Sequence, residues 1–88
     1  MRPVKPIHPG MMLQEEFIAP TGVTQRALAE KLGWTVSKLN ELIKGKRGIT
    51  ADTALDLAAE FGTSPEVWLG LQMYFDLRQA ELRRKRAS

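Results

Sequence analysis

The 88-residue chain contains no cysteine and only one histidine, His8. Without cysteine it can form neither a disulfide framework nor a thiolate metal site, and a single histidine cannot form a metal cluster. No run of about 18 apolar residues suggests a membrane-spanning helix, and the N-terminal MRPVKPIHPG lacks the apolar segment of a signal peptide. The sequence therefore predicts one small cytoplasmic domain without membrane, metal or cofactor.

Catalytic motifs are missing as well. There is no second histidine to pair with a nucleophile, and no glycine-rich phosphate loop follows a strand. Glu15 and Glu16 are adjacent on a predicted helix, so their side chains should diverge. Asp52 and Asp56 are four residues apart and share a helix face, but without further ligands they are expected to form a solvated face. We therefore do not expect an enzyme.

Charge is distributed unevenly along the chain. Residues 24–49 carry six basic and two acidic side chains, and residues 78–88 carry five basic and one acidic. Residues 50–77 carry five acidic side chains and no basic one. A basic block that coincides with one surface element indicates a nucleic-acid partner better than the net charge of +3 does.

Helix caps and apolar spacing predict an all-α fold of five helices with short connections. Prolines at positions 3, 6 and 9 predict an extended arm over residues 1–9, followed by the domain at 10–88. Threonines before residues 25, 36 and 51 and glycines at 33, 45 and 62 delimit three central helices. A first helix is expected over 10–18 and a last one from Pro65 to about Lys85. In the fourth helix, Leu55, Ala58 and Ala59 are predicted to face inward.

The stretch TQRALAEKLGWTVSKLNELIKGK has the spacing of a helix-turn-helix. Only residues 33–35 separate its two helices, so the helices must cross steeply, and Ala29 is small enough for the crossing point. Leu39 and Leu42 can then pack under the first of the two helices. A corner of this kind also occurs in helical bundles that do not bind DNA.

The outer face of the second of these helices has the composition of a DNA-reading surface. Ser37 and Asn40 can hydrogen-bond base edges, and Val36 can contact a thymine methyl group or be partly buried. Glu41 can accept from a cytosine amino group or repel phosphate. The basic residues at the exit suit phosphates, or form an ordinary solvated loop. The predicted DNA-binding residues are Thr24, Gln25, Thr35, Val36, Ser37, Lys38, Asn40, Glu41, Lys44, Lys46 and Arg47.

The last helix predicts a homodimer. Eight of the eleven residues from Val67 to Leu77 are apolar, and they surround the helix instead of forming one stripe. One side can pack on the rest of the domain, and a second copy is the simplest cover for the other. The predicted interface residues are Trp68, Leu71, Tyr74 and Phe75.

Four blocks of the sequence resemble the HigA-type antitoxins, a family of lambda-repressor-like (Xre-like) helix-turn-helix proteins. They are PIHPG, LQEEF, GITADTALDLAAEFGTSPEVWLGLQ and DLRQAE. The chain departs from the family pattern at Met11, Gly70 and Phe75, where an acidic residue, asparagine and tyrosine are usual.

The resemblance implies two activities. One is repression of the protein's own operon through binding to a palindromic DNA operator, and the other is neutralisation of a HigB-like mRNA endonuclease toxin. The acidic candidates for meeting a basic toxin are Glu15, Glu16, Asp52, Asp56 and Glu60. A repressor without a toxin partner, or a helical protein-interaction module without DNA, remains an alternative.

Overall fold

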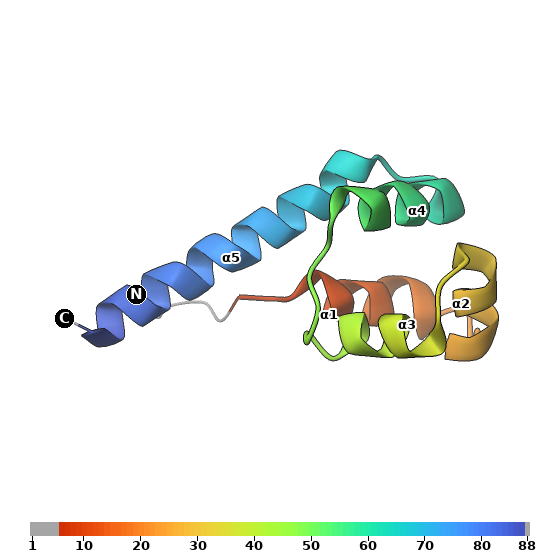
Figure 1. Ribbon diagram of the computed structural model, residues 1–88, viewed down its shortest axis with the longest axis horizontal. Coiled ribbons are helices and arrows are strands. Elements are labelled where there is room, and N and C mark those ends of the chain that lie inside the picture. The colour runs from red at the N-terminus through yellow and green to blue at the C-terminus, as the bar shows by residue number, and fades with distance from the viewer. Residues whose placement is uncertain (1–5, 88) are drawn as a thin grey trace.

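The computed structural model describes residues 6–87, which fold into five α-helices and one π-helical turn (Figure 1). The elements are α1 (Pro9–Leu13), η1 (Gln14–Ile18), α2 (Gln25–Leu32), α3 (Val36–Ile43), α4 (Ala51–Phe61) and α5 (Pro65–Ala87). This part of the chain contains no strand, so the predicted all-α class is confirmed. Residues 1–5 of the predicted arm lie outside the described residues.

Local hydrogen bonds set the bounds of the three central helices where the sequence predicted them. The hydroxyl oxygens of Thr24, Thr35 and Thr50 accept bonds from backbone amides at the helix starts, at 3.1, 3.0 and 3.3 Å. Such caps satisfy amides that have no partner inside the helix. Gly33 and Gly62 end α2 and α4 in the left-handed conformation, with φ of 73° and 69°.

The first helix differs from the prediction in its start and in its geometry. It begins at Pro9, because His8 Nδ1 accepts a 2.9 Å hydrogen bond from the backbone amide of Gly10 and so serves as the N-cap. After Leu13 the backbone continues as η1, whose widened turn is closed by a 2.8 Å bond from the Ala19 amide to the Gln14 carbonyl. The predicted regular helix over 10–18 is therefore a short α-helix followed by a π-helical turn.

Apolar side chains from all five helices form a single core. Its fully buried members include Leu13, Leu39, Leu57 and Trp68. Trp68 was predicted at the dimer interface, and that assignment is wrong because its side chain is 0% exposed within one protomer. Its indole Nε1 donates a 2.8 Å hydrogen bond to Thr63 Oγ1, which satisfies the one polar atom of the buried ring.

The buried face of α4 also differs from the prediction. Thr53, Ala54 and Leu57 point into the core, whereas Leu55 is 57% exposed and Ala59 is exposed. Several apolar residues on this short helix are compatible with more than one inward face. The contacts with α5 and α2 decide which face is buried.

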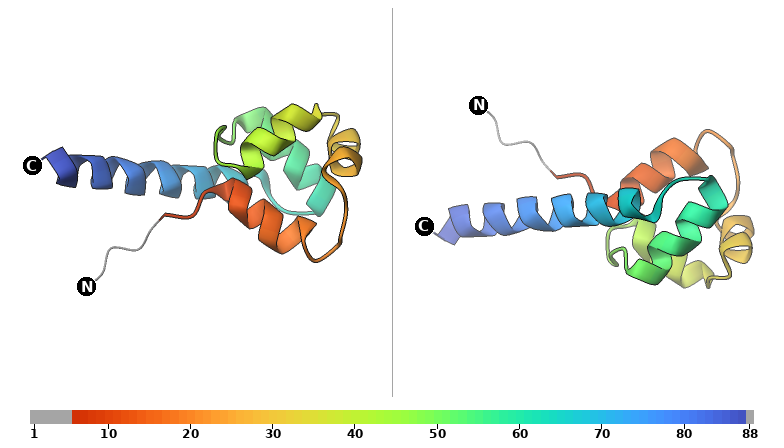
Figure 2. Two further views of the ribbon diagram at one scale, coloured as in Figure 1. Left: turned by 90° about the horizontal axis from the view of Figure 1, so that it is seen from below. Right: turned by 90° about the horizontal axis from the view of Figure 1, so that it is seen from above.

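The molecule consists of a compact head and a projecting helix. α1 to α4 and the start of α5 form the head, and the rest of α5 extends well beyond it (Figures 1 and 2). The Cα atoms span 45 × 22 × 22 Å. Among residues 6–87, no helix is long and apolar enough to cross a membrane.

Candidate nucleic-acid interface

The α2–α3 corner is held by a tight turn at Gly33. The Trp34 amide donates to the Ala29 carbonyl at 2.9 Å, and the Gly33 amide donates to the Glu30 carbonyl at 3.2 Å. This pair of bonds is a Schellman motif, and the left-handed Gly33 makes it possible without steric cost. Ala29 is 1% exposed at the predicted point of close approach. The turn fixes the direction in which α3 leaves α2.

α3 turns its apolar side to the core and its polar side outward. Leu39 and Leu42 are 0% and 1% exposed, and Ile43 packs partly buried against the core. Val36 is 44% exposed and Ser37 is exposed. Val36 is therefore partly buried, as the alternative reading expected, and its exposed part presents a methyl group beside the Ser37 hydroxyl.

A hydrogen bond across the corner joins two predicted DNA-binding residues. Asn40 Nδ2 on α3 donates to Gln25 Oε1 at the start of α2, at 3.2 Å. The two amides are separated by 15 positions in the sequence, and only the folded corner brings them together. The bond restrains the rotation of both side chains, and each amide keeps one further group that can donate or accept. Amide groups of this kind match the N6 and N7 atoms of adenine.

The exit from α3 presents three basic residues on a defined loop. The Gly45 amide donates to the Leu42 carbonyl at 3.0 Å, and the Lys46 amide donates to the Glu41 carbonyl at 2.8 Å. Lys44, Lys46 and Arg47 are all exposed. Arg47 forms a 3.2 Å ion pair with Glu41. Because both side chains are partly exposed, this pair is worth only about 0–1 kcal/mol and can be exchanged for a phosphate contact.

Lys38 and the two capping threonines are placed differently from the other predicted residues. The Lys38 ammonium lies over the Trp34 ring, 4.4 Å from its centroid, so its charge is held beside the turn. Trp34 Nε1 in turn donates to Asp56 Oδ2 at 2.8 Å, which ties the turn to α4. Asp56, expected on a solvated face, is thus a structural acceptor. Thr24 and Thr35 are exposed, and their hydroxyl oxygens cap the starts of α2 and α3.

Gly10 and His8 pack between α1, the end of α3 and α5, and the sequence reasoning missed both roles. A methyl group at Gly10 would overlap the Leu42 carbonyl oxygen, so α1 and α3 are packed backbone to backbone. The His8 ring packs edge-on against Phe75 of α5, with 4.8 Å between centroids. Histidine followed by Pro9 has the pattern of an N-cap with proline at the first helical position, the signal that correctly placed Ser64 and Pro65.

Burial lowers the pKa of His8 below its ordinary value of 6.5. The charge of Asp76 and a hydrogen bond to the Arg47 backbone act in the opposite direction, but desolvation is the larger effect. A neutral ring is also what the N-cap requires, because Nδ1 must keep a free lone pair to accept from the Gly10 amide.

The exposed apolar surface of α5 differs in part from the predicted interface. Tyr74 is 51% exposed, whereas Leu71 and Phe75 are half-buried against the head. Met73 and Leu77, which were not predicted as interface residues, are 62% and 50% exposed. The outward side of α5 is therefore centred on Met73, Tyr74 and Leu77.

Comparison with known proteins agrees with this geometry. The helix-turn-helix family profile HTH_3 matches residues 15–68. Virulence-associated protein I of Dichelobacter nodosus is 47% identical over 75 residues, which cover 85% of this chain and 69% of that protein. Antitoxin HigA-1 of Vibrio cholerae is 42% identical over 73 residues, covering 83% and 69%. The structure of antitoxin GraA in complex with its operator superposes with a TM-score of 0.88 at 40% identity, covering 99% of this chain and 88% of that one.

Proposed function

Because the chain belongs to the helix-turn-helix family that includes the HigA antitoxins, we propose that it represses its own operon and neutralises the toxin encoded there. The observation that carries the proposal is the outer face of α3. There the exposed Val36 and Ser37 lie beside the hydrogen-bonded side-chain amides of Gln25 and Asn40, and a basic loop follows the C-terminus of the helix. This combination suits a major groove bordered by phosphates.

In the proposed complex, different residues read bases and hold the backbone. Val36, Ser37 and the Gln25–Asn40 pair face the base edges, where the thymine methyl and adenine pattern is available. Lys46 and Arg47 contact phosphates, and the amides at the start of α2 hold a further phosphate. Glu41 restrains Arg47 in the free protein, and we propose that it releases the arginine on binding.

We propose that the repressor acts as a twofold dimer joined through α5. The exposed Met73, Tyr74 and Leu77 supply the apolar surface. Burial of each large side chain contributes about 1.5–3 kcal/mol, so a second copy gains substantially by covering them. A twofold dimer places two α3 helices on two half-sites, about 34 Å apart or a multiple of that distance, in a palindromic operator.

We propose that the toxin, a HigB-like mRNA endonuclease, binds a surface separate from α3. The similarity to Antitoxin HigA-1 supports a toxin partner. The outer side of α4 carries Asp52 and Glu60, which suit a basic protein, while Asp56 is already bonded to Trp34. Complementary charge would mainly accelerate association and make it sensitive to salt.

Operator binding is tested by separating base contacts from phosphate contacts. Ser37→Ala and Asn40→Ala should each relax the preference at one base pair by about 1–3 kcal/mol. Lys46→Ala and Arg47→Ala should weaken all sequences equally and reduce the slope of log K against log salt by about one. Lys31→Ala, an exposed lysine outside the proposed interface, is the matched control and should leave both unchanged. Identical behaviour of the two groups of variants would contradict the division.

Toxin neutralisation is tested by co-expression growth beside an operator reporter. A Ser37→Ala, Asn40→Ala double variant should lose repression but still rescue cells that express the adjacent toxin. Asp52→Lys with Glu60→Lys should impair rescue more than operator binding. Immunoblotting must show equal protein levels. If the folded α3 variant fails to rescue, the two functions share a surface. If the unmodified protein rescues no adjacent toxin, it is a repressor without a toxin partner.

A further inference from the structure

The exit loop that follows α3, residues 44–48, is held at both of its ends. At its start, the amides of Gly45 and Lys46 donate to carbonyl groups of α3. Just past its end, the Ile49 amide donates to Gln72 Oε1 of α5 at 2.7 Å. The loop that carries the basic side chains proposed to meet phosphates therefore depends on α5 as well as on α3.

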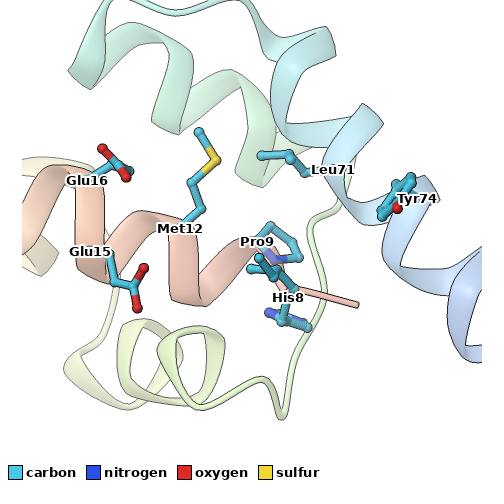
Figure 3. Close-up of a pocket in the computed structure, with 8 residues that line it drawn as sticks. His8, Pro9, Met12, Glu15, Glu16, Leu71 and Tyr74 are labelled. Carbon is cyan, nitrogen blue, oxygen red and sulfur yellow. The ribbon is translucent and has the colours of Figure 1, made fainter. Parts of the chain in front are cut away.

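His8 contacts the middle of the exit loop. Figure 3 shows its ring turned away from Met12 and Leu71 and toward the segment that follows α3. The Cγ and Cδ2 atoms of the ring lie 3.6 and 3.7 Å from the position that a Cβ on Gly45 would take. The ring also packs edge-on against Phe75 of α5, with 4.8 Å between centroids. His8 thus lies between α5 and the loop backbone and contacts both.

The two nitrogens of the His8 ring connect the exit loop to the start of α1. Because Nδ1 accepts from the Gly10 amide, the proton of the neutral ring lies on Nε2. The ring is also hydrogen-bonded to the backbone of Arg47. Removing the ring would therefore release the loop near Arg47, while the backbone bonds at the end of α3 remain.

Gln72 makes the second contact with the loop from α5. A methyl group at Gly48 would lie only 3.1 Å from Cδ and Oε1 of Gln72, closer than the 3.4 Å at which ordinary contact begins. Gln72 Nε2 donates to Asp76 Oδ1 at 2.9 Å, and this bond orients the amide so that Oε1 faces the Ile49 amide. The side chain is therefore fixed in the direction that the loop requires.

We propose that His8 and Gln72 are positioning residues for operator binding, because they hold the exit loop where its basic side chains reach DNA phosphates. The inference rests on the proposed operator binding and gives α1 and α5 a part in it. Both residues contact the loop backbone, so the side chains of Lys46 and Arg47 remain exposed. A loop that is already ordered loses less conformational entropy on binding, which strengthens its phosphate contacts.

Two substitutions remove these contacts one at a time. His8→Asn removes the ring but keeps an acceptor for the Gly10 amide, so the cap of α1 is retained. The ring already lines a cavity of about 300 Å³, so its loss extends an existing space. Gln72→Leu removes the acceptor of the Ile49 amide and leaves His8 in place.

Fluorescence anisotropy on a promoter duplex from the protein's own operon measures the effect, at salt concentrations from ~50 to ~200 mM. Each substitution should raise the Kd by about three- to tenfold at the lowest salt and reduce the slope of log K against log salt by about one, as Arg47→Ala does. The preference for individual base pairs should not change, because phosphate contacts carry no sequence information. When Lys46→Ala and Arg47→Ala are already present, His8→Asn should change the Kd by less than about twofold.

Thr63→Val is the matched control for a loss of stability. It removes the acceptor of the 2.8 Å bond from Trp68 Nε1, at the turn between α4 and α5. It should destabilise the fold while leaving the salt slope unchanged and the Kd within about twofold of the unmodified value. Circular dichroism and urea denaturation would show which variants are folded under the binding conditions. If one of the two loop variants does not fold, the other decides the result.

Loop positioning and operator binding fail in different ways. If folded variants affect the Kd and slope no more than Thr63→Val does, while Arg47→Ala lowers the slope, positioning is refuted and operator binding stands. If the base preference relaxes together with the affinity, the substitutions disturb α3 itself, and positioning is again refuted. If the unmodified protein does not prefer the promoter duplex to an unrelated one, operator binding is refuted, and the inference with it.

Discussion

Replacing Gly10 with alanine should destabilise the protein far more than its small size suggests. The added methyl group would overlap the Leu42 carbonyl oxygen and lie 2.7 Å from the carbonyl carbon. Ordinary contact begins at 3.4 Å, so the carbonyl carbon alone requires α1 and α3 to separate by about 0.7 Å, and the nearer carbonyl oxygen requires a larger movement. The obstructing atoms belong to the backbone of α3 at the buried residue Leu42, so no side-chain rotation can relieve the overlap.

The magnitude follows from three contributions. Overpacking of this kind costs about 1–3 kcal/mol. Moving the Leu42 carbonyl also weakens the 3.0 Å bond that it accepts from the Gly45 amide, at about 0.5–1.5 kcal/mol. The lower backbone entropy of unfolded alanine returns about 0.5–1 kcal/mol. The net loss should be about 2–3 kcal/mol, or a fall in Tm of ~10–20 °C for a domain of this size.

Urea denaturation at fixed protein concentration measures this loss, since a dimer's apparent stability depends on concentration. Gly70→Ala is the matched control, because a methyl group there meets nothing within 4 Å and the residue lies inside α5. It should stabilise the protein by about 0.5–1 kcal/mol. A Gly10→Ala protein within about 0.5 kcal/mol of the unmodified one would refute the backbone contact between α1 and α3.

Three further predictions concern single interactions. Because the folded pKa of His8 lies below 6.5, the unfolded chain binds more protons than the folded one. The stability of the protein should therefore fall as the pH drops from about 7.5 to 5. Thermal unfolding of His8→Asn, which keeps a capping acceptor, should not show this loss. Trp34→Phe should cost about 1 kcal/mol by removing the 2.8 Å bond to Asp56, and much less in an Asp56→Ala background; equal costs in both would contradict the bond. Gln72→Leu should cost about 1–3 kcal/mol in urea denaturation because the Ile49 amide loses its 2.7 Å acceptor, and an unchanged midpoint would show that water replaces it.

The sequence alone determined the fold class and the limits of most helices. A threonine cap or a left-handed glycine acts through hydrogen bonds to residues three to five positions away, so its effect can be read without knowing the fold. For the same reason α2 was predicted at its observed bounds, and the spacing around Ala29 and Gly33 identified the helix-turn-helix. The exposed polar side of α3 followed from helical periodicity, which placed Leu39 and Leu42 on the opposite side.

Only the tertiary structure decided which apolar residues are buried and which polar residues meet. Trp68 and Met73 both lie in the apolar run of α5, yet one is in the core and the other is 62% exposed, because the head covers only one side of the helix. The Gln25–Asn40 hydrogen bond and the close approach of Gly10 to the Leu42 backbone each join residues that are far apart in the chain. Their distances depend on how the helices cross, and helix crossing is fixed by the packing of the whole core, which no local pattern specifies.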